Sequence, residues 1–185
     1  MDMTSGAQEQ ADVFSVDLNS ETDRYFTPDS VPVDGQPSLV LIMGGPASGK
    51  TTLRRQQYAS GYVLVDAAEI FISLSRGGYY DFPDAFLEPM DLIGRLIANR
   101  AISERRNIVT EIIGSDFAET SGLIEAMRSV GYKIEAVGVT CDVEEAMKRN
   151  LSRGDDNISS YYAEPFQRQW LIDAAQRASN PSEEE

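Results

Sequence analysis

The amino-acid sequence predicts an α/β fold of three layers, in which a parallel sheet of four to five strands is covered by helices on both faces. Four short apolar runs alternate with segments of helical character, and the connections between them are short. A glycine-rich turn follows the first apolar run directly, which is where a parallel sheet commonly meets phosphate groups. These two observations indicate one domain built on a single sheet.

The four apolar runs are the expected strands. An unbroken run without polar residues is typical of a parallel strand that is buried on both faces. The third run contains a glutamate, Glu111, among β-branched residues. The predicted strands are residues 39–43, 62–65, 108–113 and 134–140.

Helices are expected in the segments between and after these strands. The stretch 116–130 has acidic residues in its first turn and Gly131 as its stop. Asp142 is the expected N-cap of another helix, with Glu145 completing a pair that resembles a capping box. The remaining predicted helices begin at the glycine-rich turn or cover residues 67–75, 88–105 and 159–178.

The two ends of the chain are predicted to be tails. Residues 1–36 are rich in Asp, Glu, Ser, Gln, Thr and Pro, so we expect an acidic, largely flexible tail. Within it, residues 12–18 alternate weakly and could add an edge strand or a short helix. The predicted domain is 37–179, and 180–185 form a second acidic tail.

Composition and charge exclude several classes of function. The formal charge of −14 disfavours a nucleic-acid polymer or an anionic membrane as partner. The absence of histidine excludes Ser–His–Asp triads, Cys–His triads and histidine-ligated metals. The single cysteine, Cys141, excludes an internal disulfide and fits a reducing compartment. No apolar run approaches the ~18 residues of a membrane span, and the polar N-terminus does not resemble a signal peptide, so we predict a cytoplasmic protein.

The glycine-rich turn matches the pattern GxxxxGK[ST] in full, and the expected strand and helix flank it correctly. Its glycines let successive N–H groups point at phosphate oxygens, and the helix start adds its positive dipole end. Lys50 can reach the β- and γ-phosphates, and the Thr51 hydroxyl can ligate Mg²⁺. The sequence therefore predicts a P-loop NTPase or kinase fold that binds ATP and Mg²⁺ through Gly44, Gly45, Pro46, Ala47, Ser48, Gly49, Lys50, Thr51 and Thr52.

The loop resembles the GxPxSGK[ST]T form of P-loop kinases that act on small molecules. The guanine-reading NKxD of Ras-type GTPases is absent from the sequence, and the chain has little room for the partner-sensing segments of motor or transporter ATPases. We therefore expect a kinase that transfers the γ-phosphoryl group to a hydroxyl of a metabolite.

A kinase of this kind needs a carboxylate that orients and deprotonates the acceptor hydroxyl. The functional crevice of a parallel sheet lies off the carboxyl ends of the strands. Asp66 ends the second strand and is the predicted base, although it could also be the N-cap of the helix 67–75. Glu69, about one turn later, is either a substrate-binding residue or a partner of the helix dipole.

Glu111 is the other carboxylate with a predicted role. A buried carboxylate in a central strand is costly unless it is paired or linked to a metal. We expect it to open into the same cleft as Lys50 and Asp66, where it could hold Mg²⁺ through water or accept hydrogen bonds from substrate hydroxyls. The alternative is a strand that ends early, with Glu111 pointing to solvent.

Arg149 and Arg153 are candidate catalytic cations because they lie four residues apart near the end of the helix that Asp142 begins. They suit a lid that brings positive charge to the transferring phosphoryl group, or they complement the helix C-terminus. Arg54 and Arg55, just after the P-loop, are interpreted as surface or inter-helix contacts.

With these pieces the chain resembles the zeta toxin family of P-loop kinases, over about residues 39–153. GGPASGKTTLRR, YVLVDAAEIF, NIVTEIIG and an arginine-bearing lid after the fourth strand carry the resemblance. It implies ATP–Mg²⁺ at Lys50 and Thr51, an acceptor contacted by Glu111, and Arg149 or Arg153 as the lid arginine. It also implies UDP-N-acetylglucosamine or a related sugar nucleotide as acceptor, and an antitoxin protein as partner.

The sequence departs from the family pattern at three places. Ala68 stands where the family usually carries its catalytic Asp, so either Asp66 or Glu69 takes over or activity is weak or absent. Arg95 falls near the place of a further acidic residue, for which Asp91 is the nearest candidate. The family's later strand and C-terminal extension have no counterpart, so trimmed substrate pockets are expected.

Two other functions stay open: a metabolite or antibiotic kinase resembling chloramphenicol phosphotransferase, and a nucleotide-binding module without catalytic activity.

Overall fold

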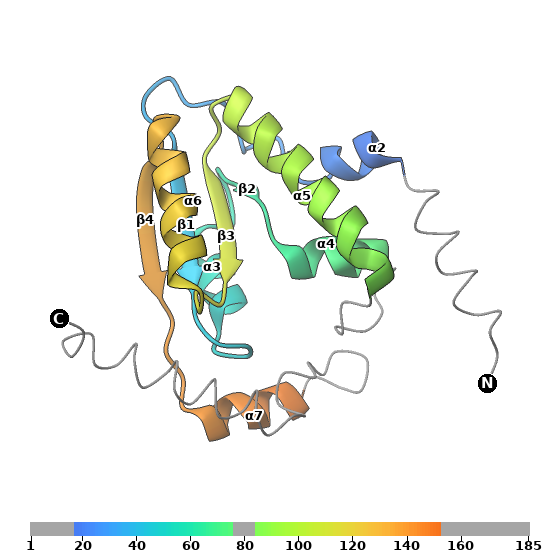
Figure 1. The fold of residues 1–185 in the computed structure, drawn as a ribbon, viewed down its shortest axis with the longest axis vertical. Helices are drawn as coiled ribbons and strands as arrows, with labels where there is room; N and C mark the ends of the chain where they lie inside the picture. The colour runs from blue at the N-terminus through green and yellow to red at the C-terminus, as the bar shows by residue number, and fades with distance from the viewer. Residues whose placement is uncertain (1–16, 76–83, 153–185) are drawn as a thin grey trace.

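A computed structural model describes residues 17–75 and 84–152, which form a four-stranded parallel sheet with helices around it (Figure 1). The strand order is β2-β3-β1-β4, and every neighbouring pair is parallel. The strands are β1 (Ser38–Met43), β2 (Val63–Leu64), β3 (Ile108–Ile112) and β4 (Lys133–Gly138). The helices are α2 (Leu18–Asp23), α3 (Lys50–Gln57), α4 (Ala67–Leu74), α5 (Asp84–Ser103), α6 (Phe117–Ser129) and α7 (Val143–Leu151).

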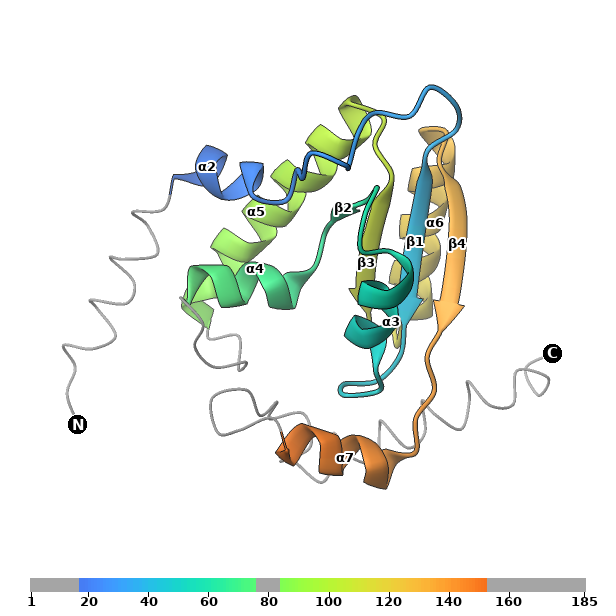
Figure 2. The ribbon, with the colours of Figure 1, turned by 180° about the vertical axis from the view of Figure 1, so that it is seen from behind.

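The central strand β1 divides the core into two layers, because successive side chains of a strand point to opposite faces. Leu39 and Leu41 pack into the larger cluster, which includes residues of α4, α5 and α6. Val40 and Ile42 pack on the other face, against Leu53 of α3. Figures 1 and 2 show α6 over one face of the sheet and α3 over the opposite face. The predicted three-layer α/β fold is confirmed.

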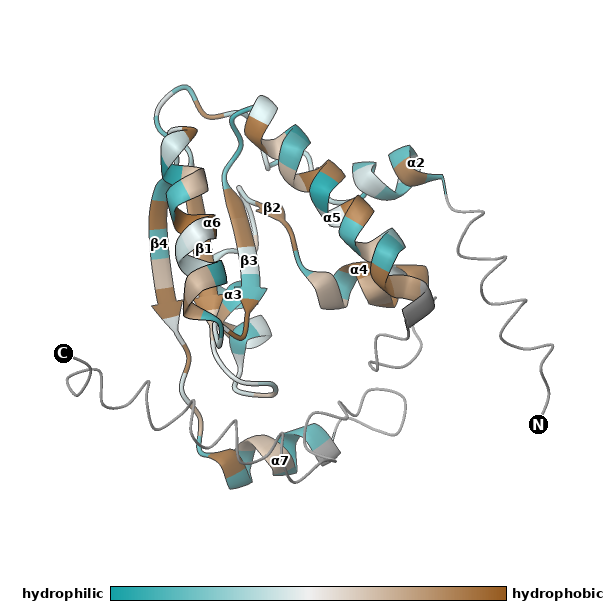
Figure 3. Cartoon of the chain, in the orientation of Figure 1, coloured by the Kyte–Doolittle hydropathy of each residue, from teal (hydrophilic) through white to brown (hydrophobic). Residues whose placement is uncertain are grey.

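Helix α5 is longer at its N-terminal end than the sequence predicts, because it begins at Asp84 rather than at residue 88. Pro89 lies inside α5 near its beginning, where only one backbone hydrogen bond is lost. Along its length, α5 carries both apolar and polar residues (Figure 3), and it buries apolar residues at three- to four-residue spacing: Phe86, Met90, Ile93, Ile97 and Ala101.

Part of the segment that we expected to be a flexible tail is folded against α5. Helix α2 begins after Asp17, whose side chain accepts a hydrogen bond from the Asn19 amide at 3.0 Å. Asp23 forms an ion pair with Arg100. The Phe26 ring lies 4.1 Å from the Arg100 guanidinium carbon, measured to the ring centroid, and it packs against the larger core cluster. Residues 17–36 therefore contribute to the domain.

The other predicted elements match to within two residues at each end. The predicted strand 134–140 is β4, which begins one residue earlier and ends at Gly138. Four parts of the predictions lie outside the described residues: the first part of the N-terminal tail (1–16), Arg153, the helix 159–178 and the C-terminal tail. None of the helices within the described ranges is long and apolar enough to cross a membrane.

Candidate active site

The P-loop lies at the carboxyl end of β1 and leads into α3. A Cβ atom on Gly44 would collide with the Val139 carbonyl oxygen and would lie 2.9 Å from Ser48 Oγ, so only glycine fits there. Gly49 has a φ of +110°, a conformation that side chains with a Cβ rarely adopt, and it is the N-cap of α3. The glycines of the motif thus shape a loop whose end is a helix N-terminus.

Two side chains of the loop are suited to phosphate. Lys50 Nζ donates hydrogen bonds to the carbonyl oxygens of Gly44 at 2.7 Å and Gly45 at 2.9 Å, which holds the ammonium group against the loop. Ser48 Oγ is buried and has no hydrogen-bond partner among the residues that the structure describes. A buried hydroxyl is normally paired, so a ligand oxygen would complete this site. The donors present fit a nucleoside triphosphate.

Glu111 faces α3 because of its register in β3. It lies two residues after Val109, so both side chains point to the same face of the sheet, and Val109 packs beside Leu53 of α3. Its Oε2 atom accepts a hydrogen bond of 2.8 Å from Thr51 Oγ1, and its side chain is only 7% exposed. The structure thus brings Glu111 to the P-loop threonine rather than to solvent.

Arg54 holds this part of the site together. Its Nε atom pairs with Glu111 Oε1 at 2.6 Å, and its Nη2 atom pairs with Glu69 Oε1 at 2.8 Å. Burial opposes the charge of Arg54, but the hydrogen bond and the charge of Glu111 outweigh it and raise the pKa of the guanidinium. The inter-helix contact that was one of the two expectations for Arg54 is present, since Glu69 belongs to α4, but the pair between Arg54 and Glu111 was not predicted. The position of Arg54 three residues after Thr51, on the same side of α3, was the signal that could have identified this pair.

Asp66 lies at the carboxyl end of β2 and is the N-cap of α4. Its Oδ1 atom accepts a hydrogen bond of 2.9 Å from the Glu69 amide. Burial raises the pKa of Asp66 to about 6, and the charges of Glu111 and Glu69 act in the same direction. The Glu69 amide and Arg54 act against this rise. Asp66 can therefore hold or release a proton near neutral pH, which a general base requires.

The remaining predicted site residues are less closely gathered. Helix α7 contacts the P-loop, since Ala146 packs against Ala47, but the Arg149 guanidinium pairs with Glu145 of the same helix at 3.0 Å. Asp91 is 57% exposed and pairs with Arg95 along α5. Among the described residues, neither Arg149 nor Asp91 has a hydrogen bond or an ion pair with Glu111.

The fold and the P-loop define a nucleotide-dependent kinase of the P-loop class. Within that class the chain belongs to the zeta toxin family, whose family model matches residues 22–169. The family resemblance seen in the sequence is thus confirmed, and the match extends into the segment that contains α2.

Solved structures with the same fold include three that are distant in sequence. One is from the PezAT chromosomal toxin–antitoxin system of Streptococcus pneumoniae, with 14% identity and a TM-score of 0.67 over 93% of this chain and 74% of that chain. A second, from the Pnkp1/Rnl/Hen1 RNA repair complex, has 18% identity and a TM-score of 0.60 over 80% of this chain and 47% of that chain. The third, AvrRxo1-ORF1:-ORF2 with ATP, has 18% identity and a TM-score of 0.50 over 95% and 58%. The chain spans about half the length of the last two. A search of curated proteins gave no match.

Proposed function

We propose that the protein is an ATP- and Mg²⁺-dependent kinase that transfers the γ-phosphoryl group to a hydroxyl of a metabolite, with a sugar nucleotide such as UDP-N-acetylglucosamine as acceptor. The observation that carries the proposal is the hydrogen bond between Thr51 and Glu111, which joins the phosphate loop to a buried carboxylate on a neighbouring strand. Membership of the zeta toxin family supports the choice of acceptor class.

The P-loop residues from Gly44 to Thr52 would hold the triphosphate. Its backbone amides, the Lys50 ammonium and the buried Ser48 hydroxyl supply the donors that phosphate oxygens accept. Mg²⁺, held by Thr51 Oγ1 and by phosphate oxygens, would neutralise charge on the transferring group. The ATP present in the AvrRxo1-ORF1:-ORF2 structure supports ATP as the donor.

The acceptor hydroxyl would meet the carboxylates on the β2 side of the loop. Asp66 is the proposed base because it is buried, ends β2 and has a pKa near neutrality. Glu69 and Glu111 would bind and orient the acceptor, with Asp91 farther out on α5. Arg149, and Arg153 beyond it, would supply lid charge once Arg149 leaves Glu145.

A phosphoryl-transfer assay tests this proposal. The protein is incubated with γ-labelled ATP and Mg²⁺, with either UDP-N-acetylglucosamine or a metabolite extract as the acceptor source. We expect a labelled product from the unsubstituted protein and none from Lys50→Ala, because Lys50 serves the phosphates and not the core. Equal turnover by both proteins would remove the P-loop from the mechanism.

Ala68 favours a second candidate, a nucleotide-binding module without catalytic activity, because it replaces the family's usual catalytic Asp. The same assay separates the two. Binding of ATP without transfer to any component of the extract would favour the module.

The wider proposal includes an antitoxin protein as partner, which the family and the fold shared with a toxin–antitoxin protein support. It also includes a cytoplasmic location.

A further inference from the structure

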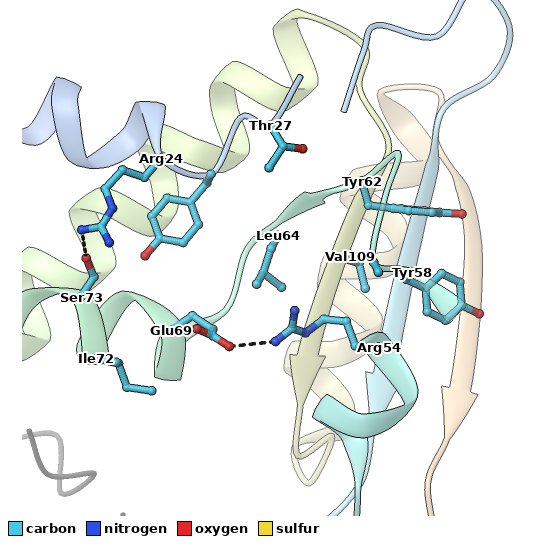
Figure 4. Close-up of a pocket in the computed structure, with 12 residues that line it drawn as sticks. Arg24, Thr27, Arg54, Tyr58, Tyr62, Leu64, Glu69, Ile72, Ser73 and Val109 are labelled. Carbon is cyan, nitrogen blue, oxygen red and sulfur yellow. Dashed lines mark hydrogen bonds and ion pairs between the residues drawn. The ribbon is translucent and has the colours of Figure 1, made fainter. Parts of the chain in front are cut away.

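Helix α4 forms one wall of a cavity of about 650 Å³ (Figure 4). Three of its residues line the cavity, Glu69, Ile72 and Ser73, because a spacing of three and four residues places them on one side of the helix. The other side of α4 carries buried apolar residues that pack on the larger core cluster. The two sides of α4 are therefore fixed by different contacts, apolar on the core side and polar on the cavity side.

Each polar residue on the cavity side of α4 is bonded to an arginine from another part of the chain. Glu69 Oε1 pairs with Arg54 Nη2 of α3 at 2.8 Å. Ser73 Oγ accepts a hydrogen bond of 2.6 Å from Arg24 Nη1, at the end of α2. Figure 4 shows both contacts, which reach α4 from different directions. Since Glu69 and Ser73 lie four residues apart, the two arginines bind α4 at points about 6 Å apart along its axis.

Arg24 is itself well placed to fix the position of Ser73. It is the C-cap of α2, and its Nη1 atom also donates to Glu21 Oε2 at 3.1 Å. The Glu21 side chain is only 9% exposed, so it orients the guanidinium from inside the protein. Two residues after Arg24, the Phe26 ring packs on the larger core cluster. The contact with Ser73 therefore joins α4 to a segment that is tied to the core.

Helix α4 connects Ser73 to two carboxylates of the candidate active site. Asp66 is the N-cap of the helix, and its Oδ1 atom accepts the hydrogen bond from the Glu69 amide. The helix has eight residues, so it is about 12 Å long and moves as one short body. A displacement at Ser73 therefore changes where Asp66 and Glu69 lie relative to the P-loop.

The carboxylates repel one another, which makes a second contact on this side of α4 useful. Glu69 and Glu111 share one cation, Arg54. Asp66 stands close enough to feel the negative charge of both, in addition to the burial that mainly raises its pKa. Repulsion between like charges favours movement of α4 away from β3, and the bond between Arg24 and Ser73 limits such movement.

We propose that Arg24 is a positioning residue, which fixes α4 through Ser73 so that Asp66 and Glu69 keep their places beside the P-loop. The effect on the position of α4 can be measured without any substrate. The effect on turnover rests on the proposed kinase function.

Amide hydrogen exchange, followed residue by residue by NMR, tests the position of α4. The reporter is the Glu69 amide, which donates to Asp66 Oδ1 at 2.9 Å. Its matched control in the same protein is the Glu119 amide, which donates to Asp116 Oδ1 at the same distance at the start of α6.

Five proteins are compared with the unsubstituted one. Arg24→Gln and Ser73→Ala each remove one partner of the contact, and a protein with both substitutions tests whether their effects are shared. Arg24→Lys keeps a cation that can donate to Ser73 Oγ. Arg128→Gln removes an exposed cation from the last turn of α6 and is the control.

We expect the Glu69 amide to exchange about two- to fivefold faster after Arg24→Gln or Ser73→Ala, because Arg24 is 63% exposed and exposed charged contacts contribute modestly. Both substitutions together should add nothing further, and Arg24→Lys should keep nearly the original rate. The Glu119 amide should be unchanged in every protein, and Arg128→Gln should change neither amide. The proposal is overturned if the Glu69 amide keeps its rate in both single variants, or if the Glu119 amide accelerates equally.

The phosphoryl-transfer assay keeps this inference distinguishable from the proposed function. With γ-labelled ATP and a metabolite extract, Arg24→Gln and Ser73→Ala should lower the rate of transfer about two- to fivefold, and Arg24→Lys should restore most of it. Faster exchange at Glu69 in the two variants, without transfer by the unsubstituted protein, would support the role of Arg24 in placing α4 and remove the kinase. Equal transfer by all proteins, with unchanged exchange at Glu69, would support the kinase and remove the role of Arg24.

Discussion

At the scale of single residues, the Arg54 guanidinium shares its charge between Glu111 and Glu69, and its side chain is only 12% exposed. A buried ion pair tolerates the loss of one partner poorly, since the other charge is left in a poorly solvated place. Burial is the main cause of the raised pKa of Asp66, and the negative charges of Glu111 and Glu69 raise it further. Arg54 is thus a positioning residue for Glu111 and Glu69.

Glu111→Gln should lower the free energy of unfolding by roughly 1–3 kcal/mol, because Thr51 and Arg54 donate to different oxygens of Glu111 and the amide nitrogen of glutamine cannot accept either bond. Turnover or acceptor affinity should fall, while affinity for an ATP analogue should stay nearly unchanged. Denaturant unfolding and analogue titration measure the two effects. Glu145→Gln is the control, since its half-exposed pair with Arg149 should change stability by less than about 1 kcal/mol. Full activity of the Glu111→Gln protein would contradict the assignment.

Asp66→Asn should reduce kcat by about 10²–10⁴ if Asp66 is the base. An asparagine can still accept the hydrogen bond from the Glu69 amide, so α4 should keep its N-cap and the fold should persist. Circular dichroism checks the fold and steady-state kinetics check the rate. If Glu69→Gln is the damaging change instead, the base lies one helical turn farther along α4.

The pH dependence of the unsubstituted protein provides a separate prediction. Because a base must be ionised, kcat/KM should rise as the pH is raised through about 6, and Asp66→Asn should lack this rise. Stability should change in the opposite direction. The folded state holds the Asp66 proton more tightly than the unfolded chain, so this contribution is complete below about pH 4 and is lost as the pH rises through about 6. A kinetic profile that is flat between about pH 5 and 7 would contradict the role of Asp66.

At the scale of elements, α2 and the turn after it complete the domain from a segment of low hydrophobicity. Phe26→Ala should destabilise the protein by about 2 kcal/mol, because the ring packs on the core and lies against Arg100 and Arg106. Phe117→Ala is the matched control, since Phe117 is 84% exposed and should change stability by less than about 0.5 kcal/mol. Thermal unfolding of both variants measures the difference, and equal effects would exclude a structural role for the segment around α2.

The elements that sequence analysis predicted well are those whose signals are local. The apolar runs predicted β1 and β3. The acidic first turn of the stretch 116–130 predicted α6, and the capping signal at Asp142 marked the start of α7. The six-residue helix α2 was not predicted as part of the domain because its partner, Arg100, lies 77 residues beyond Asp23. Periodicity within the helix carries no information about such a contact.

The candidate site followed the same rule. The P-loop could be predicted because its conformation requires a fixed pattern of glycines, and Glu111 could be predicted because a carboxylate among β-branched residues is costly. The link through Arg54 could not, since it depends on how α3, α4 and β3 meet in space. The cavity that Arg54, Tyr58 and Glu69 line also takes residues from β2, β3 and the turn after α2, so it forms only once the chain is folded.

At the scale of the whole molecule, binding to the folded state alone should stabilise all of it. A non-hydrolysable ATP analogue with Mg²⁺, at about 100 times its Kd, should raise the Tm by roughly 5–10 °C. Lys50→Ala should remove most of this shift while keeping the Tm of the ligand-free protein within a few degrees. Differential scanning fluorimetry measures both values, and an equal shift in the two proteins would place the nucleotide elsewhere.

The strand order β2-β3-β1-β4 has a consequence for the chain while it is being made. Strand β1 lies inside the sheet, yet both its neighbours follow much later, since Leu39 pairs with Ile108 and with Ile134. At about 5–20 residues per second, a ribosome needs roughly 3–14 s to extend the chain from Leu39 in β1 to Ile108 in β3. During that interval the most apolar strand of the protein has no partner on either edge. Newborn chains are therefore most exposed to aggregation, and most dependent on chaperones, after β1 has emerged and before β3 follows it.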